Sequence, residues 1–149
     1  MTYTEEMSKK LNELLEKNYD AEKGYKKAAE IVDNTKLKQF FNDQAQNRYD
    51  FGHELKSEIR NHGEEPDKGG SATGSAHRTW MDIKTTFTSN DEEAILEEVQ
   101  KGEKEAVEEY NEIISDTTLP PTTQSILKKQ RDSVQEALRS AKNFEVVVS

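Results

Sequence analysis

The chain has 149 residues, no cysteine and a net charge of −9 at pH 7, because 30 acidic side chains outnumber 21 basic ones. This acidic balance disfavours nucleic acid and anionic membrane surfaces as partners. The lack of cysteine excludes disulfides, thiolate metal sites and cysteine nucleophiles. Only 32% of the residues are hydrophobic and 34% are charged. With helical apolar spacing, that composition suits a long helical bundle with a narrow core, and the length predicts a single domain over residues 1–149.

The N-terminal stretch MTYTEEMSKK lacks the apolar segment of a signal peptide, and no apolar run approaches the length of a membrane span. Together with the lack of cysteine, these features predict a cytoplasmic protein.

Apolar residues recur at helical spacing in five stretches. The predicted helices cover about residues 4–33, 35–61, 75–87, 90–115 and 121–144. Thr4 is the expected N-cap of the first helix, and Gly63 is the expected C′ residue after the second, next to His62 in its last turn. Ser89 and Glu92 have the spacing of a capping box that opens the third long helix.

The link between the second and third long helices is the only long one, with about 28 residues that include the short helix. Each long helix spans roughly 40 Å, and a link of this length can traverse that distance. The second and third long helices can therefore run parallel, so that two antiparallel hairpins are joined by a crossover. The sequence predicts an up-down-down-up four-helix bundle.

Polar residues interrupt the apolar faces at mid-length. At about 100° per residue, Asn18, Glu22 and Tyr25 fall within roughly 40° of the apolar Leu11 and Ala29. The other long helices place Arg48, Glu103, Tyr110 and Gln130 in the corresponding band. We expect these seven residues to form a buried polar layer, because polar groups inside a bundle need partners on the facing helices.

Arg48 is the cation of this layer. We hypothesise that it forms a salt bridge with Glu103, Glu22 or both, and that Asn18, Gln130 and the two tyrosines complete the hydrogen bonds. Such a layer is costly unless it is fully satisfied, and its usual role is to fix helix register. In the alternative interpretation, Arg48 extends to solvent and Glu22 lies at a helix edge.

Several segments resemble an uncharacterised bacterial family of ferritin-like four-helix bundles, a domain of unknown function. They are LNELLE with DAEKGYKKAAE, RYDF with the nearby HEL, GSATGSAHRTW, and ILEEVQKGEKEAVEEY, and the resemblance covers about residues 9–143. The segment LNELLEKNYDAEKGY is also similar to the first helix of bacterioferritins and rubrerythrins. The resemblance implies a ferritin-like fold and offers no established activity.

A ferritin-like di-iron site takes a Glu from each of two helices and a Glu-x-x-His pair from each of the other two. The resemblance places these ligand positions on Asn18, Arg48, Phe51, Glu103, Gln130 and Ser133. Glu103 alone keeps the ligand type, and the charge of Arg48 opposes cation binding. Asp50 and His53, the acid-x-x-His pair of the chain, fall on the outer face of their helix. The resemblance therefore implies a degenerate site without a cofactor, with iron as the alternative.

His77, Arg78 and Trp80 lie in the short crossover helix and have two interpretations. They either pin the crossover to the bundle or form a recognition surface for a ligand or partner. The charged exterior offers few other contact surfaces, apart from the apolar tail Val146–Val148.

Three functions remain open from the sequence. The first is a non-catalytic bundle that associates with itself as a homo-oligomer or with a partner, with a role in stress suggested by the ferritin-like analogy. The second is a metal-dependent oxidase or an iron-storage protein. The third is a small-molecule binder that uses a mid-bundle cavity lined by Tyr25, Tyr110 and Glu103.

Overall fold

The chain forms an all-α bundle in the computed structural model, which describes residues 2–68, 80–83, 85–116 and 118–148. The elements are α1 (Tyr3–Ile31), α2 (Thr35–Asn61), the 3₁₀ turn η1 (Ser89–Asp91), α4 (Glu92–Ile114) and α5 (Pro121–Val148). Residues 80–83 and 85, from the expected crossover helix, are also helical. No strand occurs in these described ranges, and the predicted all-α class is confirmed.

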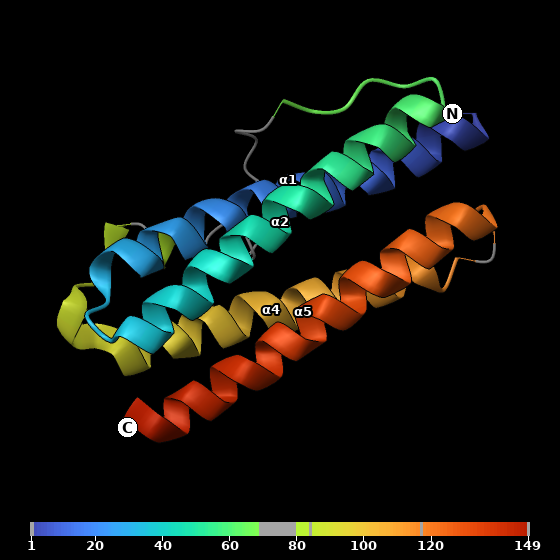
Figure 1. The fold of residues 1–149 in the computed structure, drawn as a ribbon. Coiled ribbons are helices and arrows are strands. Elements are labelled where there is room, and N and C mark those ends of the chain that lie inside the picture. The colour runs from blue at the N-terminus through green and yellow to red at the C-terminus, as the bar shows by residue number, and fades with distance from the viewer. Residues whose placement is uncertain (1, 69–79, 84, 117, 149) are drawn as a thin grey trace.

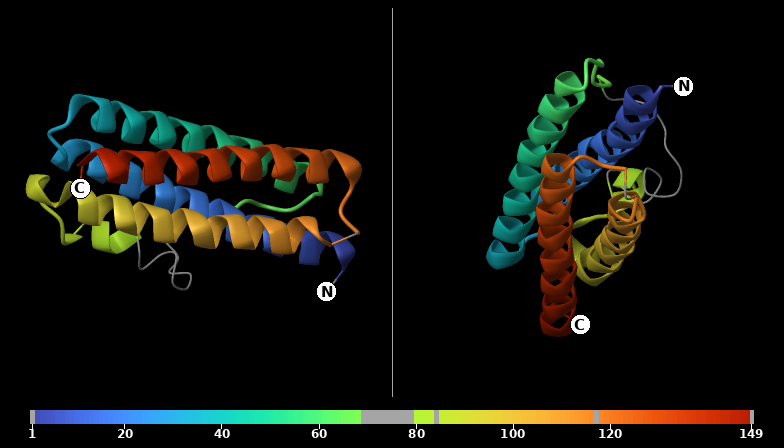
Figure 2. Two further views of the ribbon diagram at one scale, coloured as in Figure 1. Left: turned by 90° about the horizontal axis from the view of Figure 1, so that it is seen from below. Right: turned by 90° about the vertical axis from the view of Figure 1, so that its right-hand side faces the viewer.

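The long helices are arranged as two hairpins. In Figure 1, α1 and α2 run antiparallel and form one hairpin, and α4 and α5 form the other. In the same view α2 and α4 both begin at the left end of the bundle and end at the right, so these two helices run in the same direction. Across the interface between the hairpins, α1 contacts α4 and α2 contacts α5 (Figure 2). The middle of this four-helix interface is where inward side chains from both hairpins meet.

The start of α1 and the end of α5 differ from those predicted. The N-cap of α1 is Thr2, whose side chain accepts a hydrogen bond from the Glu5 N–H at 3.2 Å, so the prediction of Thr4 was wrong. Helix α5 continues past Phe144 to Val148. The last four residues contain neither Gly nor Pro, so nothing in them interrupts the helical hydrogen bonds.

The capping box before α4 lies one residue earlier than predicted. Asp91 is the acidic partner: its carboxylate accepts from the Thr88 N–H at 2.9 Å. Glu92, the residue expected in this role, instead accepts the N–H groups of Asp33 and Asn34 at 3.2 and 3.0 Å. Glu92 therefore ties the start of α4 to the link between α1 and α2.

Helix α2 ends in a Schellman motif, as the position of Gly63 predicts. Gly63 has a φ of 80° and donates to the Arg60 carbonyl at 2.9 Å. The next residue, Glu64, donates to the Ile59 carbonyl at 3.2 Å. Only glycine adopts a positive φ without steric cost, which explains its place here.

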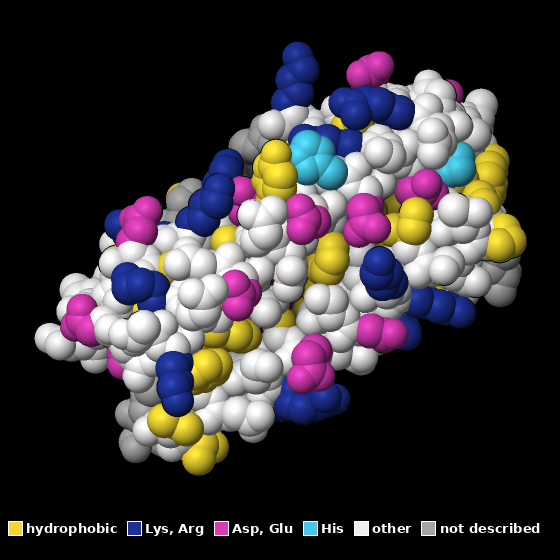
Figure 3. Space-filling view, viewed as in Figure 1, with side chains coloured by type: hydrophobic (Ala, Val, Ile, Leu, Met, Phe, Trp, Pro, Cys, Tyr) yellow, Lys and Arg dark blue, Asp and Glu magenta, His cyan; other side chains and the backbone are white. Residues whose placement is uncertain are grey.

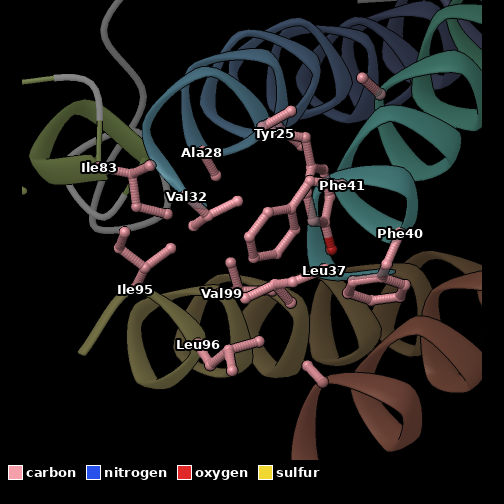
Figure 4. Packing of buried hydrophobic residues seen from close by; sticks show 14 of the residues in the cluster. Tyr25, Ala28, Val32, Leu37, Phe40, Phe41, Ile83, Ile95, Leu96 and Val99 are labelled. Atoms are coloured by element: carbon pink, nitrogen blue, oxygen red, sulfur yellow. The ribbon is translucent and has the colours of Figure 1, made fainter. Parts of the chain in front are cut away.

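The apolar core has two parts, one toward each end of the bundle. The first contains Ala28, Val32, Phe41, Ile95 and Val99 and is shown in Figure 4, where Ile83 of the crossover lies near Val32 and Ile95. The second gathers residues such as Leu11, Leu55 and Ile113 from the other ends of the helices. Along the sequence, Asn18 of α1, Arg48 of α2 and Glu103 of α4 lie between these two clusters, whereas Tyr25 belongs to the first and Tyr110 to the second.

The surface in Figure 3 carries acidic and basic side chains side by side, without a large area of one sign. Among the described residues, no helix combines the length and the apolar character required to cross a bilayer.

Candidate functional site

The centre of the bundle holds an ion pair between the two hairpins. Arg48 of α2 donates from Nη2 to Oε1 of Glu103 on α4, and the two side chains are only 2% and 0% exposed. The hydroxyl of Tyr25 on α1 donates to the other carboxylate oxygen, Oε2, at 2.7 Å. Both oxygens of Glu103 are therefore engaged by groups from the first hairpin.

Burial and neighbouring charges shift the pKa values of Arg48 and Tyr25. Burial disfavours the charged form of Arg48, but the adjacent Glu103 carboxylate and the two tyrosines hold its pKa above the usual value. Burial, and then the negative charge of Glu103, raise the pKa of Tyr25 well above its usual value. Tyr25 is thus a neutral donor at neutral pH, and Arg48 supplies the positive charge that Glu103 needs in this water-poor interior.

A second, neutral group of hydrogen bonds lies in the same layer. Asn18 of α1 donates from Nδ2 to the Tyr110 hydroxyl of α4 at 3.0 Å, and Tyr110 donates to Oε1 of Gln130 on α5 at 2.7 Å. Burial is the main cause that raises the pKa of Tyr110 to about 12, although Arg48 and the Asn18 bond oppose the shift. The Gln130 amide extends the network by donating to the Phe51 carbonyl at 3.3 Å and to Glu54 Oε1 at 3.2 Å.

One acceptor of this layer lacks a partner among the described residues. Asn18 Nδ2 also donates to the Leu14 carbonyl at 2.8 Å, which fixes the orientation of the amide. The other end of the amide, Oδ1, is buried without a hydrogen bond. A buried acceptor left in this way costs about 1–3 kcal/mol.

The two groups of bonds are related by a spacing that recurs on α1 and α4. Asn18 and Tyr25 on α1, and Glu103 and Tyr110 on α4, each have a spacing of seven residues. In the structure each tyrosine bonds to the first member of the opposite pair: Tyr25 to Glu103, and Tyr110 to Asn18. Arg48 and Gln130, from the second helix of each hairpin, complete the two halves. The layer therefore consists of one charged half and one neutral half.

Glu22, the remaining residue expected in the layer, lies apart from it. Its side chain is half-buried and forms an ion pair with Lys26 at 2.7 Å, one turn further along α1. The structure therefore pairs Arg48 with Glu103. Glu22, the other partner considered, lies toward the outer edge of α1.

The residues of this layer do not fit a di-iron centre. Phe51 offers no ligand side chain, and its backbone carbonyl is bonded to Gln130. Glu103 is already engaged by Arg48, whose positive charge at this position opposes cations. Ser133 is half-buried on α5. Asp50 and His53 are both exposed; Asp50 accepts from Gln46 at 3.0 Å, and the His53 ring lies 4.5 Å from that of Tyr49.

Of the three crossover residues singled out in the sequence, Trp80 is described, whereas His77 and Arg78 lie outside the described residues. Trp80 is 2% exposed, and its ring centroid lies 5.0 Å from that of Tyr25. This position favours the packing interpretation for Trp80. It also places the indole against Tyr25, a residue of the polar layer.

Several contributing residues were overlooked in the sequence. Glu54 accepts from Gln130, and the buried Glu58 accepts from the Thr123 hydroxyl at 2.6 Å, with His62 Nε2 3.4 Å from that hydroxyl. The sequence did not single out these residues, because they lie beside the apolar stripes of their helices. Gly24 and Gly102, which flank Trp80, could have been singled out from the sequence, because a glycine in the middle of a helix is unfavourable without a local reason.

Comparison with known proteins gives one family match. The family model described as Domain of unknown function (DUF2383) matches residues 6–116. The matched part contains α2, α4, most of α1 and every residue of the layer except Gln130. No curated protein matches the chain.

Proposed function

The chain belongs to the DUF2383 family, and we propose that it is a ferritin-like, up-down-down-up bundle whose function does not use a metal centre. In this proposal the protein is not an enzyme and acts by association with itself or with a partner protein. The directions of the four long helices in Figure 1 and the polar layer at mid-length support the ferritin-like assignment.

The observation that carries the proposal is the buried pair of Arg48 and Glu103. In a di-iron bundle, carboxylates at this depth neutralise the metal ions. Here a guanidinium takes the place of the metal cation and neutralises the Glu103 carboxylate, and a tyrosine hydroxyl occupies the second carboxylate oxygen. The negative charge of Glu103 is thus balanced by a side chain of the protein itself. The same direct bonds occupy the groups that would line the mid-bundle cavity required by a small-molecule binder.

Metal content tests this proposal. The wild-type protein and a Glu103→Ala variant are loaded with ferrous iron under anaerobic conditions, desalted and analysed for iron. We expect both to retain far less than one iron per chain, without a difference between them. About two irons per chain in the wild type, lost in the variant, would identify an oxidase or storage protein and overturn the proposal.

Association is expected to use the end of α5, where Val146 and Val147 are 78% and 76% exposed. A Val147→Asp variant places a charge on this apolar end, and Asn143→Asp adds the same charge at a nearby exposed position. In sedimentation equilibrium we expect the wild type and Asn143→Asp to associate and Val147→Asp to be monomeric. If the wild type stays monomeric at all concentrations, self-association is excluded and association with a partner protein remains.

A further inference from the structure

Two glycines in the middle of different helices face the same indole ring. Gly24 lies in α1 and Gly102 in α4, and both are buried against Trp80. A Cβ added at Gly102 would lie 2.7 Å from Cζ2 and 2.8 Å from Cε2 of the indole. A Cβ at Gly24 would overlap Cε3 on the opposite edge of the six-membered ring and lie 3.2 Å from Cδ2. Glycine is therefore the residue that admits the ring at both positions.

Two helix backbones and one aromatic ring of the bundle border this space. The backbones of α1 and α4 border two edges of the indole, and the Tyr25 ring lies against it at an interplanar angle of 48°. Tyr25 is itself held by its bond to Glu103. We call this space, bordered by Gly24, Gly102 and Tyr25, the indole slot.

We propose that the indole slot is a preformed binding site for a planar bicyclic aromatic molecule, and that Trp80 is its internal occupant. A core made of flexible side chains relaxes into the space that a deleted ring leaves. Helix backbones held by internal hydrogen bonds move only as rigid bodies, so we expect the slot to keep its shape when the ring is removed. Apolar cavities with rigid walls stay dry and bind aromatic molecules of matching size.

The first test removes the occupant and supplies free indole as the probe. Trp80 is the only tryptophan of the chain, so the Trp80→Gly variant has no indole emission of its own. We expect indole to bind this variant with one-to-one stoichiometry and a shift of its emission to shorter wavelength. At a concentration ten times its Kd, indole should raise the Tm by about 3–6 °C. Wild-type protein should bind at least about 100-fold more weakly, because Trp80 competes from within the chain.

Matched glycine variants locate the binding. In the Trp80→Gly background, Gly24→Ala places a methyl group in the slot and should weaken indole binding by at least about 10-fold, in line with the close packing of such sites. Gly52→Ala is the control, because among the described residues its added Cβ meets only Leu15 Cδ1, at an ordinary 3.7 Å. Absence of binding to Trp80→Gly, or equal weakening by the two alanine substitutions, would overturn the proposal.

A second test keeps Trp80 in place and does not depend on the folding of the Trp80→Gly variant. Gly24→Ala and Gly102→Ala should each displace the ring, which shifts the Trp80 emission to longer wavelength and increases its quenching by acrylamide several-fold. Gly52→Ala should leave both signals at the wild-type values. Unchanged emission in Gly24→Ala and Gly102→Ala would show that the two glycines do not define the slot.

Discussion

The guanidinium of Arg48 and the carboxylate of Glu103 form a buried ion pair that joins α2 of one hairpin to α4 of the other. Among the residues that the structure describes, removing the cation leaves Glu103 with only the Tyr25 hydroxyl as a partner. We therefore expect Arg48→Leu to lower the free energy of unfolding by about 3–5 kcal/mol, as for other buried charges that lose their partner. Urea denaturation at pH 7 measures this loss.

The control for this variant is Arg139→Leu on α5. Arg139 pairs with Glu136 at the surface, where the two side chains are 69% and 64% exposed. Exposed pairs of this kind contribute at most about 1 kcal/mol. Equal, small losses in Arg48→Leu and Arg139→Leu would show that Arg48 does not support the core.

Tyr110 should make the fold sensitive to alkaline pH. Its pKa is raised to about 12 in the folded protein from a usual value of 10.0. The unfolded chain therefore loses this proton first, and stability falls as the pH rises from 10 toward 12. At pH 11.5 this effect lowers the free energy of unfolding by about 2 kcal/mol relative to neutral pH.

Comparison with a Tyr110→Phe variant isolates this effect. The variant is less stable than the wild type at pH 8, because Asn18 and Gln130 lose their shared partner. Urea unfolding at pH 8 and 11.5 should show this gap narrowing by about 2 kcal/mol, since phenylalanine has no proton to lose. A gap that is constant with pH would contradict the buried, neutral state of Tyr110.

Asp116 should make the stability of the fold sensitive to acidic pH. The Lys10 ammonium, 2.5 Å away, and the Thr118 hydroxyl and N–H hold the pKa of Asp116 far below its usual 3.8. The stabilisation is therefore present above pH 3.8 and is lost as the pH falls below that value. Asp116→Asn should lower the Tm at pH 7, and this difference should shrink at pH 3. Asp132→Asn, at an exposed position, serves as the control.

The sequence predicted the helices and the depth of the polar residues, because helical periodicity places Asn18, Tyr25 and Glu103 on inward faces whatever the tertiary packing. The partner of Arg48 was left open, since the angles on isolated helices do not fix how far one helix is rotated against another. The structure resolves this choice through Lys26, which lies one turn from Glu22 and pairs with it at the edge of α1.

The contact between Trp80 and the two glycines was not predicted, although its signal is present. Gly24 and Gly102 each interrupt a strong helical pattern at a cost of about 1 kcal/mol relative to alanine. Either glycine alone gives no hint of its partner, because the ring that it accommodates comes from a separate segment of the chain. Only the packing of α1 beside α4 brings both glycines to the same side chain.

The central claim is that Arg48 and Glu103 depend on each other inside the bundle. A double-mutant cycle tests it most directly, with the unfolding free energies of the wild type, Arg48→Leu, Glu103→Leu and the double variant. We predict a coupling energy of at least about 2 kcal/mol, with the double variant more stable than Arg48→Leu alone. Single effects that add within about 0.5 kcal/mol would contradict the account.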